Sequence, residues 1–163
     1  MSKMRKGPYR PRVPALRVLL HNIRSAHNVG SMFRTSDAIG VARIFLSGYT
    51  PLPVDRFGRP VKEIAKTALG AEKSVPWSGE RDVSRVIARA KEEGFVVVGL
   101  EQDARSVDYT RYSIDQPTLF IVGNEVRGMS PSLRAKCDVL IEIPMRGTKE
   151  SLNVSVSFGV ALF

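Results

Sequence analysis

Short unbroken apolar runs alternate along the chain with longer segments whose apolar residues recur every three or four positions. The runs have the length of buried β-strands and cover residues 16–20, 42–46, 95–100, 119–122 and 139–143. A further short strand is expected at 73–77. Because most of these runs are apolar at consecutive positions, both faces of each strand should be covered, which is typical of a parallel sheet.

The segments between the runs have the spacing of amphipathic helices. Residues 28–39 predict a helix that begins at Asn28 as N-cap and stops at Gly40. Further helices are predicted at 61–69, at 83–90, from Ser130 onward and at 151–163. Strands that alternate with helices indicate an α/β fold, in which a mostly parallel sheet carries helices on both faces.

The chain divides into a basic arm and one domain. Residues 1–14 hold five lysines or arginines and three prolines, and the prolines forbid a regular helix there. We expect a flexible arm of the kind that contacts phosphates. Residues 15–163 have the size of a single domain with its own core.

Net charge and cysteine content narrow the function classes. With 25 Lys and Arg against 16 Asp and Glu, the net charge of +9 favours a polyanionic partner, most often nucleic acid. The single cysteine excludes an intramolecular disulfide, and with only two histidines no metal site is expected. The N-terminus lacks the apolar region of a secretory signal, and no apolar run reaches membrane-spanning length, so we expect a cytoplasmic protein without a membrane partner.

The common nucleotide-binding fingerprints are absent from the sequence. There is no G-x-x-x-x-G-K-[ST] loop, no G-x-G-x-x-G turn after the first strand and no G-x-S-x-G elbow. Ligands of α/β sheets still bind beyond the carboxyl ends of the strands, which directs attention to residues 101–110, 123–130 and 144–151. Taken singly, each of these segments is also explained by ordinary turn chemistry.

Three segments in sequential order resemble the motifs of one protein family. They are 22–40 (NIRSAHNVGSMFRTSDAIG), 119–130 (LFIVGNEVRGMS) and 141–163 (IEIPMRGTKESLNVSVSFGVALF), with KTALGAE at 66–72 as an intermediate match. The chain resembles the SpoU/TrmH branch of the SPOUT superfamily, which comprises S-adenosyl-L-methionine-dependent RNA ribose 2′-O-methyltransferases. The resemblance implies a C-terminal deep trefoil knot and a homodimer whose sites are completed across the interface.

The resemblance also assigns roles to individual residues. It places the cofactor against Leu100, Gly123, Ile143, Met145 and Leu152. It carries the family's catalytic positions over to Asn28, Arg34, Glu125, Ser151 and Asn153. For Arg34 two roles stay open. In the first it deprotonates the ribose 2′-OH. In the second, which we favour because a guanidinium is a poor general base, it anchors a phosphate and stabilises the developing alkoxide.

RNA contacts are expected from the basic surface. The first candidates are Arg24, Lys66, Arg127 and Arg146, with Arg43, Arg56, Arg59 and Lys62 beside them. A minimal catalytic domain favours tRNA as substrate, with rRNA close behind. Family members commonly carry additional N-terminal segments and a longer last helix, so substrate recognition is the feature that the resemblance determines least. The alternatives are a non-catalytic RNA-binding or ribosome-assembly factor on the same scaffold, and a methyltransferase acting on a base nitrogen.

Overall fold

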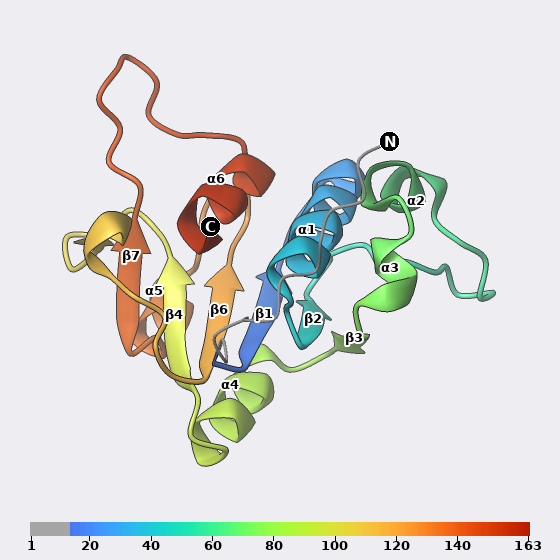
Figure 1. Ribbon diagram of the computed structural model, residues 1–163, viewed down its shortest axis with the longest axis horizontal. Helices are drawn as coiled ribbons and strands as arrows, with labels where there is room; N and C mark the ends of the chain where they lie inside the picture. The colour runs from blue at the N-terminus through green and yellow to red at the C-terminus, as the bar shows by residue number, and fades with distance from the viewer. Residues whose placement is uncertain (1–13) are drawn as a thin grey trace, which may run out of the picture.

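A computed structural model describes residues 14–163 of the chain (Figure 1). Seven strands form one sheet in the order β3-β2-β1-β6-β4-β7-β5, and all six strand pairings are parallel. The strands are β1 Leu16–His21, β2 Arg43–Ser47, β3 Trp77–Glu80, β4 Val96–Leu100, β5 Val107–Asp108, β6 Thr118–Val122 and β7 Val139–Glu142. The helices are α1 Ala26–Ile39, α2 Lys62–Ala68, α3 Ala71–Ser74, α4 Val83–Glu92, α5 Pro131–Ala135 and α6 Val154–Leu162, with a short 3-10 turn, η1, at Tyr109–Arg111. The predicted mostly parallel α/β sheet is confirmed.

Each face of the sheet has its own hydrophobic core, because neighbouring residues of a strand point to opposite faces. Val18 and Phe120 belong to the cluster that includes α1, α2, α3 and α6, whereas Leu19 and Ile121 belong to the cluster that includes α4 and α5. Phe120 also meets Phe158 of α6 edge to face, with ring centroids 6.2 Å apart. Helices therefore cover both faces, as predicted.

Helix α1 lies against α2 at unusually close range. Gly30 is buried at this contact, and a Cβ atom placed on it would overlap Thr67 Oγ1 and the backbone oxygen of Ile64. The Thr67 hydroxyl also donates to the backbone oxygen of His27 (2.8 Å). The absence of a side chain at Gly30 thus sets the distance between the two helices.

Several element boundaries differ from the sequence prediction. Helix α1 begins at Ala26, because the Ser25 hydroxyl accepts from the backbone N–H of Asn28 (3.2 Å) and acts as the N-cap. Asn28 therefore lies in the first turn, and its prediction as N-cap was wrong. The strand predicted at 73–77 was also wrong: residues 71–74 form α3, and the strand begins only at Trp77. Helix α6 begins after Asn153, three residues later than predicted.

The parallel arrangement brings the ends of all seven strands to one edge of the sheet. The segments after β1, β2, β4, β6 and β7 leave this edge together, which is the position expected for a ligand site. Within residues 14–163 no helix is long and apolar enough to cross a membrane. The basic arm predicted at 1–14 falls almost wholly outside the described residues, and the trefoil knot stays a prediction.

Candidate functional site

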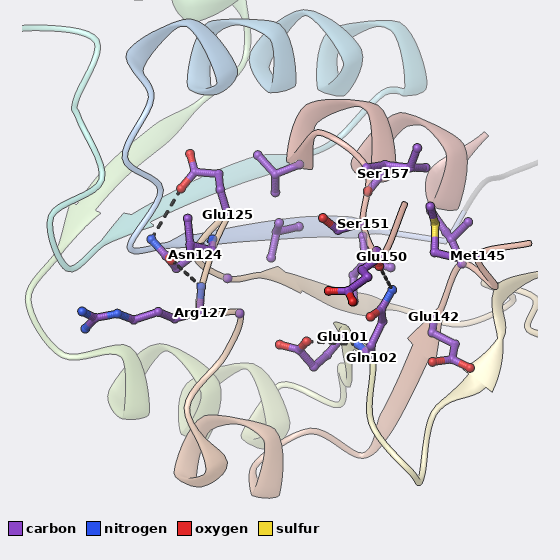
Figure 2. A pocket seen from close by; sticks show the side chains of 18 residues that line it. Glu101, Gln102, Asn124, Glu125, Arg127, Glu142, Met145, Glu150, Ser151 and Ser157 are labelled. Carbon is purple, nitrogen blue, oxygen red and sulfur yellow. Dashed lines mark hydrogen bonds between the residues drawn. The ribbon is translucent and has the colours of Figure 1, made fainter. Parts of the chain in front are cut away.

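A cavity of about 300 Å³ opens at the carboxyl edge of the sheet, between the segments that follow β4, β6 and β7 (Figure 2). Its walls mix apolar side chains with backbone and carboxylate groups. All five residues predicted to contact a cofactor line it: Leu100, Gly123, Ile143, Met145 and Leu152. Three segments far apart in the sequence thus converge on one cavity whose size suits a small organic ligand.

Glu125 ties the segment after β6 to the start of α1. Its carboxylate accepts from the backbone N–H groups of Arg24 (3.0 and 3.1 Å) and Ser25 (3.1 Å), and from Nδ2 of Asn28 (3.4 Å). Partial burial alone would raise the pKa of this carboxyl. The hydrogen bonds outweigh it and hold the pKa of Glu125 below its ordinary value. Glu125 is therefore an ionised carboxylate at the cavity that holds the segment after β6 against the start of α1.

Asn28 and Asn153 extend these hydrogen bonds to the last helix. Nδ2 of Asn153 donates to Oδ1 of Asn28 (3.2 Å), while its own Oδ1 accepts from the backbone N–H of Ser155 (2.9 Å) and caps α6. The predicted catalytic residues Glu125, Asn28 and Asn153 thus form one connected hydrogen-bond chain. Ser151, two residues before the cap, lines the cavity itself.

Asn124 has a larger structural role than the sequence analysis gave it. It is buried, and its Nδ2 donates to the backbone oxygen of Asn22 (3.0 Å) and to the Tyr49 hydroxyl (2.9 Å). Its Oδ1 accepts from the backbone N–H groups of Val126 and Arg127 (2.9 and 2.7 Å), which closes the turn drawn in Figure 2. A turn-forming Asn between Gly123 and Glu125, directly after a buried strand, was the signal available in the sequence.

Glu101 also escaped the sequence analysis. Its carboxylate accepts from the backbone N–H groups of Met129 (2.6 Å) and Gln102 (3.0 Å), and a Cβ on Gly128 would overlap it. Glu142 and Glu150 line the same cavity, so the walls carry acidic groups in a protein of net charge +9. A carboxylate one residue after the clearest predicted strand was a weak signal, because surface glutamates are common at such positions.

Arg34 stands apart from the other predicted catalytic residues. It lies on α1, is exposed, and does not line the cavity. Of the predicted RNA-contacting residues, Arg127 lines the cavity, and Figure 2 shows its side chain extending outward from it. Arg24, Lys66 and Arg146 are exposed outside the cavity lining. Over residues 14–163, no group of three or more His, Cys, Asp or Glu side chains is arranged to hold a metal ion.

The fold and the site define the class: an α/β protein with a cavity at the carboxyl edge of a parallel sheet, in which Glu125 of the cavity lining begins the Glu125–Asn28–Asn153 hydrogen-bond chain. The sequence profile of the SpoU rRNA methylase family matches residues 15–163, and the chain belongs to this family.

Curated relatives are similar along most of the chain. The 23S rRNA (guanosine-2′-O-)-methyltransferase RlmB of Nitrosomonas europaea is 35% identical over 150 residues, which covers 92% of this chain and 55% of that protein. The enzyme of the same name from Neisseria meningitidis serogroup B is 34% identical over 149 residues, covering 91% and 57%. The chain thus spans less than two thirds of the length of these relatives.

Solved structures agree in fold. The AdoMet-bound rRNA methyltransferase from Sinorhizobium meliloti matches with a TM-score of 0.79 and 29% identity, covering 95% of this chain and 57% of that one. The A. aeolicus TrmH/SpoU tRNA modifying enzyme matches with a TM-score of 0.78 and 29% identity, covering 90% and 71%.

Proposed function

We propose that the protein transfers a methyl group from S-adenosyl-L-methionine to a ribose 2′-OH of RNA. The observation that carries this proposal is the convergence of the five predicted cofactor residues on one cavity, which Glu125 and Ser151 also line. Asn28 is hydrogen-bonded to Glu125, and Asn153 is hydrogen-bonded to Asn28. Family membership and the names of the relatives support the proposal. We infer that residues 15–163 are the methyltransferase domain.

The cavity has the chemistry that this cofactor needs. Leu100, Ile143 and Leu152 offer apolar surface to an adenine ring, and the Glu101 and Glu150 carboxylates favour a ligand that carries positive charge. When bound, the cofactor supplies a methyl group already activated by its sulfonium. The chain's own task is to orient the two reactants and to exclude water. Orientation lowers the barrier because the reacting atoms no longer have to find each other in solution.

Arg34 is the residue that we propose to act on the acceptor. Its guanidinium is exposed and forms no ion pair within residues 14–163, so its donors are available to a phosphate or to a developing alkoxide. Arg34→Lys should lower methyl transfer about 100-fold or more, because loss of one such donor typically costs that much. Binding of S-adenosylmethionine should be unchanged, since Arg34 does not line the cavity.

The acceptor RNA is tested by offering labelled S-adenosylmethionine with total tRNA and, separately, with ribosomal RNA. The names of the curated relatives move our preference from tRNA toward ribosomal RNA. Digestion and mass measurement should reveal a 2′-O-methyl nucleoside in one pool. A base-methylated nucleoside would contradict ribose transfer, and a protein that neither transfers methyl nor binds the cofactor would be a non-catalytic RNA-binding protein.

We further propose that the active form is a homodimer. Helix α6 is mostly apolar, yet Val156 and Val160 are 50% and 38% exposed and Phe163, which follows the helix, is 86% exposed. This is surface that a second copy would bury. Family resemblance implies that each site of such a dimer is completed across the interface. Sedimentation of the protein should give twice the chain mass, and Val156→Lys should give the monomer; a monomeric wild-type protein would contradict the proposal.

We also infer the trefoil knot from family membership. After β7 the chain crosses back past β4, so that α6 packs on Phe120 of β6 and against α1, and this return is compatible with a threaded chain. An experimental electron-density map in which residues 139–163 trace without passing through a loop would contradict it.

A further inference from the structure

The segment between β2 and α2 carries an exposed aromatic and cationic surface that the site described above does not use. Figure 1 shows this segment projecting away from the sheet beside α2. Tyr49 and Phe57 are 58% and 66% exposed, although large aromatic side chains usually bury most of their surface. Between and after them lie two arginines, Arg56 and Arg59.

The base of this segment is fixed to the candidate active site. The Tyr49 hydroxyl accepts from Nδ2 of Asn124, the residue that forms the turn beside Glu125. The Thr50 side chain is buried, donates to the backbone oxygen of Ser47 (2.8 Å) and accepts from the backbone N–H of Ile23 (3.1 Å). The segment therefore starts from a rigid point at the same sheet edge as the cavity.

The tip of the segment is held by Asp55. Its carboxylate accepts from the backbone N–H groups of Phe57 (2.8 Å) and Arg59 (2.9 Å) and from Nε of Arg59 (2.8 Å). A bridge between Val54 and Pro60 closes the turn. The backbone that carries the aromatic ring is thus held in place, although the ring packs against neither hydrophobic core.

Both arginines lie against the exposed ring. The guanidinium carbons of Arg56 and Arg59 are 4.7 and 5.0 Å from the centroid of the Phe57 ring. Arg59 is neutralised by Asp55, whereas Arg56 forms no ion pair within the described residues. The result is a cationic, aromatic surface that is assembled without a ligand, and such preorganisation lowers the entropy cost of binding.

We propose that Arg56, Phe57 and Arg59 form a platform for an unpaired nucleotide of the RNA substrate. A base stacks on the exposed part of this ring and guanidinium cluster, and the free charge of Arg56 contacts a phosphate. This inference rests on the proposed function for the identity of the ligand. Aromatic rings with arginines are the chemistry by which proteins recognise single-stranded RNA, whereas a duplex hides its bases from such a surface.

The test uses the full chain and a short fluorescein-labelled single-stranded RNA of mixed sequence, without cofactor. Phe57→Leu keeps an apolar side chain but removes the stacking plane, so affinity should fall about tenfold, as expected for loss of one stacked base. Phe57→Trp should restore it. Binding of the same sequence as a duplex should change by less than about twofold in both variants.

The role of Arg56 is tested against a matched control variant. Arg56→Ala should reduce the salt dependence of single-strand binding by about 0.7 in log–log slope, as expected for one lost phosphate contact. Arg85→Ala removes an exposed arginine from α4, on the opposite face of the sheet, and should leave the slope unchanged. Equal effects of the two substitutions would overturn the assignment of Arg56.

The outcomes separate this inference from the proposed function. Three results would overturn the platform, even if methyl transfer is observed. They are wild-type RNA affinity in Phe57→Leu, failure of Phe57→Trp to restore binding, and a Phe57 variant that changes the oligomeric state but not the RNA affinity. A tenfold loss in Phe57→Leu that Phe57→Trp restores supports the platform, even if no methyl transfer is found. Because Phe57 is mostly exposed, all variants should keep the unfolding temperature of the wild type.

Discussion

At the scale of single residues, Glu125 holds together two segments that are far apart in the sequence. Its carboxylate faces the N–H groups of Arg24 and Ser25, just ahead of α1, where the helix dipole also favours negative charge. Asn28 adds a side-chain donor from the first turn. One ionised group thereby joins two segments that lie 100 residues apart.

This arrangement predicts a specific pH dependence for Glu125→Gln. The pKa of Glu125 is lowered in the folded state, so its ionisation stabilises the fold above the ordinary value of 4.5 and this contribution disappears as pH falls through the lowered pKa. At pH 7 the variant should lose about 1–2 kcal/mol of unfolding free energy, because bonds to a charged acceptor become bonds to a neutral one. Urea unfolding at neutral and acidic pH measures the difference, which should shrink toward zero in acid.

The matched control is Glu92→Gln, at the exposed end of α4. The Glu92 carboxylate has no hydrogen bond or ion pair to any described residue, so this substitution should leave the unfolding free energy within about 0.5 kcal/mol of the wild type. If the difference in unfolding free energy between the wild type and Glu125→Gln stays constant with pH, ionisation of Glu125 does not stabilise the fold.

At the scale of elements, two contacts of α1 position the site. Gly30 lets α2 approach, and Asn28 meets the N-cap of α6. Helix α1 thereby carries Asn28 against Asn153 on one side while Arg34, two turns further on, stays exposed.

Gly30→Ala should lower stability by about 1–3 kcal/mol, because the new methyl group overlaps a backbone oxygen that cannot rotate away. Gly159→Ala in α6 is the matched comparison, since its Cβ would meet only Thr35 Cγ2, at 3.9 Å. That substitution should be neutral or stabilise by up to about 1 kcal/mol through helix propensity. Chemical unfolding of both variants checks the contrast, and equal losses would show that the α1–α2 contact is not the cause.

Substitutions of Asn153 separate helix capping from the hydrogen-bond chain. Asn153→Ala removes the cap of α6 and should cost about 1 kcal/mol in unfolding free energy. Asn153→Asp keeps the capping oxygen but cannot donate to Asn28, so stability should be retained while methyl transfer falls. Unfolding and activity are measured on the same preparations; full activity in Asn153→Asp would remove the Asn28–Asn153 contact from the proposed mechanism.

At the scale of the whole molecule, charge is divided between the cavity and its surroundings. The protein carries +9 overall, yet Glu101, Glu142 and Glu150 line the cavity. A basic exterior attracts a polyanion, while an acidic interior suits a small ligand with positive charge. The two proposed ligands, RNA and cofactor, are thus distinguished by electrostatics.

This division predicts different salt responses for the two ligands. RNA affinity should fall with salt with a log–log slope steeper than about −2, which corresponds to three or more phosphate contacts. Affinity for S-adenosylmethionine, measured by calorimetry over the same range, should change little, because its contacts would lie inside the cavity. An RNA affinity that does not respond to salt would contradict a role of the basic surface.

The sequence predicted those elements whose pattern is dense and local. The buried strands β1, β4 and β6 and the helix α4 agree with their predicted positions to within a residue or two. The edge strands could not be found in this way: β5 has two residues and β3 reads WSGE, so neither offers an apolar run. The N-cap of α1 was predicted at Asn28 but is Ser25, because the spacing of apolar residues does not show which of several polar residues caps a helix.

By itself, the sequence determined the α/β alternation, the basic charge and the set of residues that the family motifs single out. Only the tertiary structure decided that Glu125 meets Ser25, that Asn28 meets Asn153, and that Arg34 lies outside the cavity lining. The reason is physical. Periodicity and capping reflect contacts within a few residues, whereas these pairs are brought together by the position of β6 beside β1 and by the return of α6 onto α1.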